Sequence, residues 1–409
     1  MKPVSGQRAF TVTLQWLLSA VCAIAVANLY YDQVLLSGIM NDFHVHSNRA
    51  GLLLTVIQAG YTIGLLFIVP LGDRLNRRRL ILASLLLSAF WLVLMTVVPT
   101  FYLLLAAGFL LGISTVTAQL IIPFVSSNLQ TVNKGAVIGR LLTGIFLGVL
   151  LGRVVGGWIG QLFNWQTMHI FAAALLLFIA AYLYAKLPDD LAPKQPSYSA
   201  IMRSMIPMLT QEPVLRETII LGAAAFAAFN IFWVPLTLIL NGAPYHFSSG
   251  LTGMFGIIGI AGAGAAGFSG RLSDGPHTQK WNTAALFLML LSFAVLGFGW
   301  NHLSLLIGVT FLLDVGSRMN MSLNQGRIYK LAPEKHSRLN SLYMVGYYFG
   351  GSLGSGIGTF AYHVGHVSGM VLSGCVILGL AILYFLLHGK ETKRLNNRYK
   401  RELKTNLGE

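Results

Sequence analysis

The chain has 409 residues, of which 55% are hydrophobic and only 10% are charged. A water-soluble protein carries roughly 25% charged residues, so this chain lacks the charge needed to cover a water-facing surface. The formal net charge of +15 would suggest nucleic-acid binding in a soluble protein, but its distribution along the chain points elsewhere. Both cysteines fall inside apolar segments, so no disulfide framework is expected.

Apolar segments of about 20 residues, the length that crosses a bilayer, recur along the whole chain. Helices are the expected conformation because isolated strands leave their backbone groups unsatisfied in lipid. The first segment resembles a signal peptide ending near Ala27, but its apolar character continues, so we expect a span there. We therefore predict an all-α membrane protein with twelve transmembrane helices, at 14–38, 51–71, 80–98, 102–124, 138–161, 167–185, 217–240, 251–270, 282–299, 303–325, 340–362 and 368–388.

The positive charges are distributed unevenly between the predicted loops. Of the 28 lysines and arginines, all except Arg49, Arg153 and Arg318 lie at the N-terminus, in the even-numbered loops or the span ends next to them, or in the C-terminal tail. Cytoplasmic loops carry such an excess, so both termini are predicted to be cytoplasmic and the number of spans to be even. The basic tail at 390–409 is interpreted as a topology anchor or as a contact with anionic membrane lipid.

A proline-rich break at 187–215 divides the chain. It is predicted to be a cytoplasmic linker with a short amphipathic piece near 198–210. It separates an N-terminal six-helix bundle at 1–186 from a C-terminal six-helix bundle at 216–389.

The two halves match each other at an offset of about 202 residues. Asn28 aligns with Asn230, His44 with His246, and a row of glycines in the fifth span (Gly148, Gly152, Gly156) with one in the eleventh (Gly350, Gly354, Gly358). We therefore predict two pseudo-symmetric six-helix bundles with the same topology. Glycines four residues apart let helices approach closely, either as static packing or as surfaces on which two halves move.

The loop after the second span reads Leu71-Gly72-Asp73-Arg74-Leu75-Asn76-Arg77-Arg78-Arg79. This loop resembles the signature of the major facilitator superfamily, and the segment Gly270-Arg271-Leu272-Ser273-Asp274 looks like its pseudo-repeat. The fifth span, with Gly148, Gly152, Gly156 and Gly157, resembles the motif of the bacterial drug:proton antiporter branch with twelve spans. The resemblance implies an inner-membrane transporter that works by alternating access, with proton-coupled efflux of small organic molecules bound between the halves. Two positions depart from the antiporter pattern: Gly108 lies where an arginine is expected, and Arg153 where a proline is expected.

The signature residues are predicted to form a conformational latch on the cytoplasmic side. An acid at a helix end can cap a neighbouring helix, and arginines can pair with acids or lipid phosphate. For the arginines, topology anchoring is an equally good interpretation. The predicted latch residues are Asp73, Arg74, Arg77, Gly270 and Asp274.

Four charged residues lie inside predicted spans and away from the span ends: Asp32, Arg153, Asp314 and Arg318. Charges inside a membrane are costly and usually functional. We predict that Asp32 and Arg153 lie close enough to interact, and that Asp314 and Arg318 pair along one helix face. Competition between a proton and an arginine for a buried carboxylate would couple transport to protons. The alternative is a structural role, in which neutral pairs fix helix packing.

Polar and aromatic residues on the helices that would line the cavity are candidates for binding substrate, although each could equally serve in ordinary helix packing. They are Asn28, Tyr31, Gln58, Tyr61, Gln119, Asn230, Trp233, Gln325 and Tyr347.

The sequence contains no phosphate-binding loop, nucleotide motif or nucleophile constellation, so we expect neither an enzyme nor an ATP-driven pump. No cofactor, nucleic-acid partner or strong metal site is expected, although His44 and His46 could hold a metal weakly. The expected partners are a small-molecule substrate, protons and lipid, and the expected state is a monomer. Two alternatives to efflux stay open, namely proton-coupled uptake of an organic anion and a membrane sensor that transports nothing.

Overall fold

A computed structural model describes residues 12–128, 134–188, 197–273, 277–328, 330–331 and 336–406. In this part of the chain the regular structure is entirely helical, which confirms the predicted all-α class. The elements are α1 Val12–Ala27, α2 Tyr31–Phe43, α3 Ser47–Phe67, the 3₁₀ helix η1 Val69–Asp73, α4 Arg77–Val97, α5 Phe101–Ser114, α6 Thr117–Asn128, α7 Lys134–Leu162, α8 Trp165–Lys186, α9 Tyr198–Gln211, α10 Pro213–Asn241, α11 Ser249–Ser273, α12 Thr278–Gly299, α13 Leu303–Ile328 and α14 His336–Asn406.

Ten helical segments among the described residues are long and apolar enough to cross a membrane. One of them, Arg338–His388, has 51 residues, about twice the length that a single crossing needs. It contains non-helical backbone at His366, so it supplies two crossings. The 25-residue helix α11 supplies the remaining one. The described residues therefore contain the twelve predicted transmembrane helices, and the chain is a multi-pass membrane protein.

Two crossings are interrupted, which the sequence did not lead us to expect. The first is divided into α1 and α2 by residues 28–30, where the amides of Leu29 and Tyr30 bond carbonyls only three residues back. The fourth is divided into α5 and α6 after Ser114. There the Ser114 and Thr115 hydroxyls both donate to the Leu111 carbonyl, and such local bonds compete with the helical pattern.

The chain forms two compact units. Unit 1 contains residues 1–198 and 233–260, and unit 2 contains residues 199–232 and 261–409. Relative to the predicted halves, the segment 233–260 belongs with the N-terminal helices. The predicted boundaries at 186, 215 and 389 stay a prediction.

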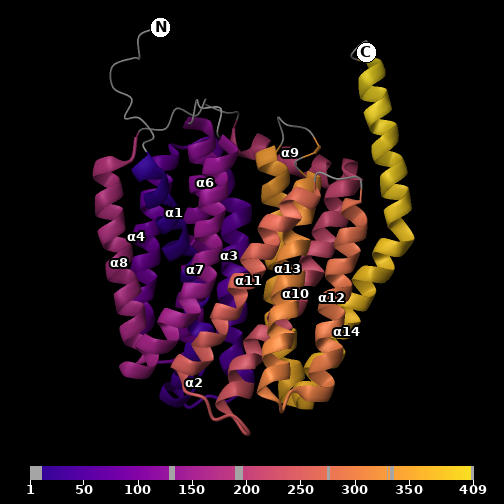
Figure 1. Cartoon of the computed structure of the whole chain (residues 1–409). Coiled ribbons are helices and arrows are strands. Elements are labelled where there is room, and N and C mark those ends of the chain that lie inside the picture. The colour runs from indigo at the N-terminus through magenta and orange to yellow at the C-terminus, as the bar shows by residue number, and fades with distance from the viewer. Residues whose placement is uncertain are drawn as a thin grey trace. The chain divides into compact units, whose positions relative to one another are not determined.

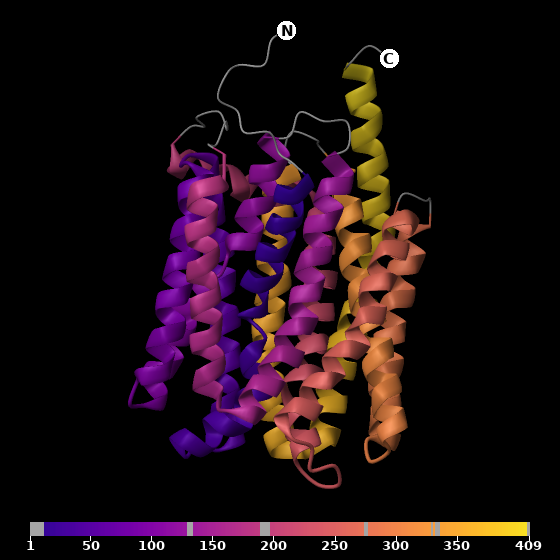
Figure 2. The same cartoon turned by 60° about the vertical axis from the view of Figure 1, so that its left-hand side comes forward.

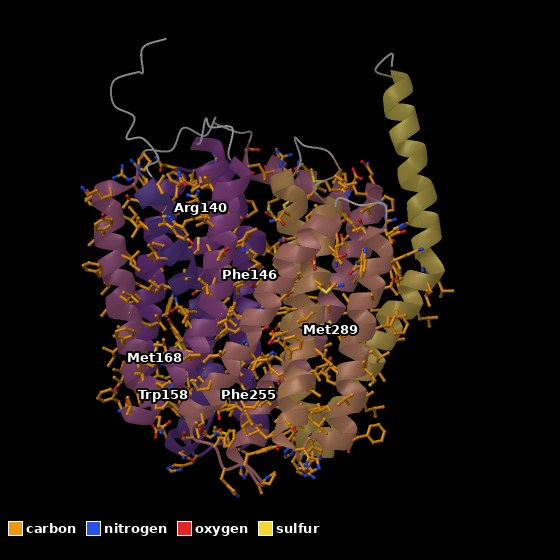
Figure 3. The ribbon with its side chains drawn as sticks, viewed as in Figure 1. Arg140, Phe146, Trp158, Met168, Phe255 and Met289 are labelled. Carbon is orange, nitrogen blue, oxygen red and sulfur yellow. The ribbon has the colours of Figure 1, made fainter. Side chains whose placement is uncertain are left out.

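Unit 1 is held together by close helix pairs. The helices α1 and α7 pack where Gly148 faces the backbone of Ala23, and a Cβ atom at Gly148 would overlap the Ala23 carbonyl. The helices α4 and α8 lie side by side in Figure 1 and again in the turned view of Figure 2. Figure 3 places Arg140 and Trp158 towards opposite ends of α7, with side chains filling the space along it.

Unit 2 repeats the same type of contact. A Cβ atom at Gly350 on α14 would overlap the carbonyl of Ala223 on α10, just as Gly148 meets Ala23 in unit 1. The helix α12 packs along α13 and α14. Because small residues bring the first and fifth crossings of each half equally close, the predicted pseudo-symmetry has a direct packing basis.

The aligned histidines also share a backbone conformation. His44 ends α2 with φ 51°, and His246 follows α10 with φ 50°. The left-handed region is uncommon for residues other than glycine, although histidine is enriched there. Matching left-handed residues after the first crossing of each half indicate that the repeat extends to the turns.

The linker contains the predicted amphipathic helix. The helix α9 spans Tyr198–Gln211 and buries Ile201, Met205 and Met208 along one face, while Ile206 is exposed. This spacing of four and three residues is that of a helix lying on a surface with one face covered.

Candidate functional site

The interruption of the first crossing brings polar residues into the interior of unit 1. Asn28 lies within the break and Asp32 one turn later, and each side chain is only 1% exposed. In membrane proteins, irregular backbone is tolerated where it is enclosed by protein, and interrupted helices often form ion or substrate sites. The break therefore marks the centre of the candidate site.

The carboxylate of Asp32 has a partner that the sequence did not reveal. The Nε2 atom of His169, on α8, lies 3.1 Å from Asp32 Oδ1. This distance is that of an ion pair, although the angles fall outside hydrogen-bond geometry. The two groups interact all the same, because electrostatic attraction depends on distance far more than on angle. The His169 side chain is completely buried, and its Nδ1 atom lies 2.9 Å from the Trp165 carbonyl oxygen.

Arg153, on α7, is also completely buried in unit 1. Its Nε atom donates a hydrogen bond of 2.9 Å to Gln33 Oε1. The guanidinium carbon lies 3.7 Å from the centre of the Trp233 ring and 5.0 Å from that of Tyr30. Aromatic faces stabilise a desolvated cation, by about 2 kcal/mol in the best cases. Aromatic rings and an amide thus surround this buried charge.

Asp32 and Arg153 are brought into one neighbourhood through consecutive residues of α2. The acid at position 32 meets His169, while the amide of Gln33 holds Arg153. The Gln33 carbonyl also accepts a 2.6 Å hydrogen bond from Thr237 of α10. The direct interaction of Asp32 with Arg153 stays a prediction. The described residues thus place one acid, one imidazole and one guanidinium around the first turn of α2.

The charged pair of unit 2 lies on α13. Asp314 and Arg318 are both buried, and the Arg318 guanidinium carbon lies 5.5 Å from the centre of the Phe229 ring. Phe229 belongs to a stacked aromatic cluster in which the Phe226 and Tyr347 rings are 4.2 Å apart. The pairing of Asp314 with Arg318 along the helix stays a prediction.

The predicted substrate-binding residues lie inside their units. In unit 2, Asn230 donates to the Phe226 carbonyl at 3.0 Å, and the Gln325 amide lies 3.4 Å from Asn340 Oδ1. Only Gln325 is partly exposed, and the other eight are buried. In unit 1 these are Asn28, Tyr31, Gln58, Tyr61, Gln119 and Trp233, and in unit 2 they are Asn230, Gln325 and Tyr347. Their burial places them in the bundle interior, and their role in binding stays a prediction.

The signature loop forms local contacts. Arg77 Nη2 lies 3.0 Å from Asp73 Oδ1, one turn apart at the start of α4, while Arg74 is exposed. The cap of α4 is Asn76, which accepts from the Arg79 amide, so the expected capping by an acid is here supplied by an asparagine. Gly270 lies in α11, and Asp274 lies outside the described residues. The latch stays a prediction.

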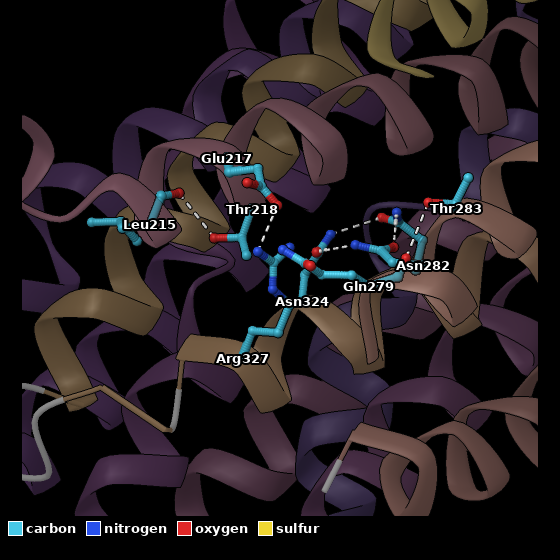
Figure 4. Close-up of polar contacts among 9 residues, drawn as sticks. Leu215, Glu217, Thr218, Gln279, Asn282, Thr283, Asn324 and Arg327 are labelled. Atoms are coloured by element: carbon cyan, nitrogen blue, oxygen red, sulfur yellow. Dashed lines mark hydrogen bonds and ion pairs between the residues drawn. The ribbon is translucent and has the colours of Figure 1, made fainter. Parts of the chain in front are cut away.

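Two polar clusters in unit 2 were missed by the sequence reasoning (Figure 4). Arg327 Nη2 lies 2.5 Å from Glu217 Oε1, and the Glu217 side chain is completely buried. Three amides, which we call the asparagine ring, also bond in sequence: Asn282 donates to Asn324, Asn324 to Asn320, and Asn320 back to Asn282. The sequence feature that could have revealed the asparagine ring is the spacing of Asn320 and Asn324, which lie one helical turn apart.

The predicted weak metal site lies in a hollow of about 450 Å³ lined by Met40, Asn41, His44, Val45 and His46. Among the described residues no group of three or more histidines, cysteines or acids is close enough to hold a metal ion.

Comparison with known proteins agrees with this architecture. A family model of the Major Facilitator Superfamily matches residues 16–300 and 279–409. The chain belongs to this superfamily. Its relatives include the uncharacterized transporter YgaY of Escherichia coli (strain K12), which is 35% identical over 362 residues, or 88% of this chain and 92% of the relative. A second, SCO4007 of Streptomyces coelicolor, is 28% identical over 83% of this chain and 79% of its own length and is named a probable transporter.

Solved structures of the superfamily share the fold. A bacterial homolog of the human lysosomal transporter Spinster, in an inward-facing and unoccupied conformation, superposes with a TM-score of 0.78 at 14% identity, covering 95% of this chain and 99% of that one. The nucleoside transporter NupG gives a TM-score of 0.74 at 12% identity, covering 92% of this chain and 99% of that one. The superfamily membership and the fold are those of a secondary transporter rather than an enzyme.

Proposed function

We propose that this transporter exports small organic molecules in exchange for protons. The observation that carries the proposal is the burial of Asp32 at the break in the first crossing, beside an imidazole and one residue from the amide that holds Arg153. An ionisable acid inside a membrane is costly unless it binds a proton or a cation during its work. Asp32 is therefore assigned as the proton-binding group.

Export is favoured over uptake by the relatives. A protein of Helicobacter pylori that is 26% identical over 86% of this chain carries the name "Probable sugar efflux transporter", as does one from Helicobacter acinonychis at 27%. Under this proposal the N- and C-terminal halves alternate around a central site, and both termini lie in the cytoplasm of a bacterial cell. The buried aromatic and amide side chains of the two units would contact the organic part of the substrate.

The test begins with a substrate search. Purified protein is screened for thermal stabilisation by sugars, amino acids, organic acids and cationic drugs, and each stabilising compound is then tested in proteoliposomes that contain a pH-sensitive dye. Antiport predicts that substrate entering the vesicles drives protons out. Asp32→Asn should abolish this proton movement but keep substrate exchange, whereas the control Glu212→Gln should leave both unchanged. Normal proton movement in Asp32→Asn would exclude Asp32 as the carrier.

Uptake of an organic anion is the second candidate, favoured by the buried guanidinium groups of Arg153 and Arg318. The same vesicles separate the two functions, because symport moves protons in the same direction as substrate and therefore reverses the sign of the dye signal. Stabilisation by a compound that never crosses the membrane would instead indicate a sensor.

A further inference from the structure

His169 bears directly on how a proton is held in unit 1, and the function inferred for it rests on the proposed role of Asp32. The Nδ1 atom of His169 lies 2.9 Å from the carbonyl oxygen of Trp165, one turn earlier on α8. A carbonyl oxygen can only accept a hydrogen bond, so Nδ1 must carry a hydrogen. In the neutral ring the other nitrogen, Nε2, then carries a lone pair and no hydrogen.

The Nε2 atom lies against the carboxylate of Asp32. Nε2 and Asp32 Oδ1 are 3.1 Å apart, and both side chains are almost completely shielded from solvent. With no proton between them, two acceptor atoms would be held in contact in a site of low dielectric, which is unfavourable. With one proton, either an imidazolium faces a carboxylate or a neutral imidazole faces a carboxylic acid, and both arrangements are attractive. The contact thus requires one shared proton.

We propose that Asp32 and His169 form a single-proton site, in which the Trp165 carbonyl fixes the tautomer of His169 and so makes the pair dependent on that proton. Releasing the proton to water leaves a carboxylate and a neutral imidazole, which then separate. The contact between Asp32 of α2 and His169 of α8 in this structure is accordingly the protonated state of the pair. Binding a proton and closing this contact become one event.

The surroundings hold the imidazole in place. The Trp165 indole donates a hydrogen bond of 2.8 Å to Asp42 Oδ2 near the end of α2, and the Gln166 amide donates one of 2.7 Å to the same oxygen. The Trp165 ring also meets the His169 ring edge-to-face, with centroids 5.4 Å apart. The start of α8 is thus fixed to the end of α2, which fixes the position of His169 relative to Asp32.

Other charged groups on the elements packed here are few. The helix α1 has none, α2 adds Asp42, and α3 has Arg49 at its exposed start. The helix α8 has Lys186 in its last turn, and α4, which packs along α8, has Arg77, Arg78 and Arg79 at its start. The helix α7 has Lys134 in its first turn, Arg140 bonded to Gln15, and Arg153 bonded to Gln33. Arg153 is the completely buried charge among them, and its partner Gln33 follows Asp32 in the sequence.

The test detects the protonation of His169 by NMR and requires neither a substrate nor a transport measurement. Protein labelled with ¹⁵N-histidine is placed in lipid nanodiscs, and NMR spectra are recorded between about pH 5 and pH 8, where histidines change charge. His169 is identified as the signals missing in His169→Gln. The proposal predicts that Nδ1 stays protonated throughout and that Nε2 shares a proton. In Asp32→Asn the amide can supply that hydrogen, so Nε2 should become an unprotonated acceptor that no longer responds to pH.

The same spectra provide a control and show the outcomes that would contradict the proposal. The exposed His302, changed to Gln, should remove one set of signals and leave those of His169 unaltered. If His169→Gln does not fold, the His169 signals are those that Asp32→Asn moves and His302→Gln retains. A neutral His169 protonated on Nε2 in the wild type, or no response to Asp32→Asn, would overturn the single-proton site. A shared proton together with proton-independent transport would refute only the proposed antiport.

Discussion

The buried ion pair of Glu217 and Arg327 gives the sharpest stability prediction. Changing Glu217 to Gln keeps the shape of the side chain but leaves the Arg327 guanidinium without a counter-charge. Glu217 is completely buried and the Arg327 side chain is 9% exposed. Breaking a buried pair by removing one partner costs about 3–5 kcal/mol. An arginine cannot escape this cost by losing its proton.

Part of the cost is offset by the helix itself. Arg327 lies in the last turn of α13, where the helix dipole favours a positive charge by about 0.3–1 kcal/mol. We therefore expect Glu217→Gln to lower the free energy of unfolding by about 3 kcal/mol, at the lower end of the range for buried pairs. The double variant Glu217→Leu with Arg327→Met removes both charges, and it should lie near the wild type because apolar side chains replace buried pairs at little cost.

The assay is reversible unfolding in mixed detergent micelles, followed by far-UV circular dichroism. Glu212→Gln, at the start of the same region but outside the pair, is the matched control and should change stability little. A cost of Glu217→Gln below about 1 kcal/mol, the value of an exposed pair, would contradict a buried ion pair here. A double variant that loses as much stability as the sum of its two single changes would also contradict the pair, because the partners would then act independently.

Three further outcomes are expected from the same unfolding assay. Gly148→Val should destabilise by several kcal/mol or prevent folding, because its side chain would enter the Ala23 backbone, whereas Gly139→Val, with open space around it, should be neutral; equal effects would contradict the close contact. Asn282→Leu should cost about 1–3 kcal/mol by leaving amides of the asparagine ring unpaired, and no loss would show that the ring is dispensable. Arg153→Lys should cost about 1–2 kcal/mol through the lost stacking on Trp233, and this loss should disappear when Trp233 is already Leu.

The site was only partly accessible to prediction. The cost of charge in lipid identified Asp32, Arg153, Asp314 and Arg318 from their position alone, and all four are buried. His169 was missed because a histidine near a span end carries no pattern; its role depends on α8 passing beside α2. Glu217 was missed because it lies at the first turns of a span, where an acid is usually taken to face water.

The sequence by itself determined the number of crossings, the family and the pairing of the repeats. These properties follow from local or one-dimensional signals: the length of apolar segments, the spacing of glycines and a constant offset between halves. The helix count was therefore confirmed even though the breaks after Ala27 and Ser114 were not foreseen.

Only the tertiary structure decided which polar groups meet. Asp32 contacts His169, 137 positions later in the chain, and Glu217 contacts Arg327, 110 positions later. No local pattern encodes such contacts, because they depend on which helix faces are turned inward once the bundle packs. In a membrane interior that choice is forced by energy, since a buried polar group without a partner costs several kcal/mol. The sequence thus identified the charged residues, and helix packing determined which groups they contact.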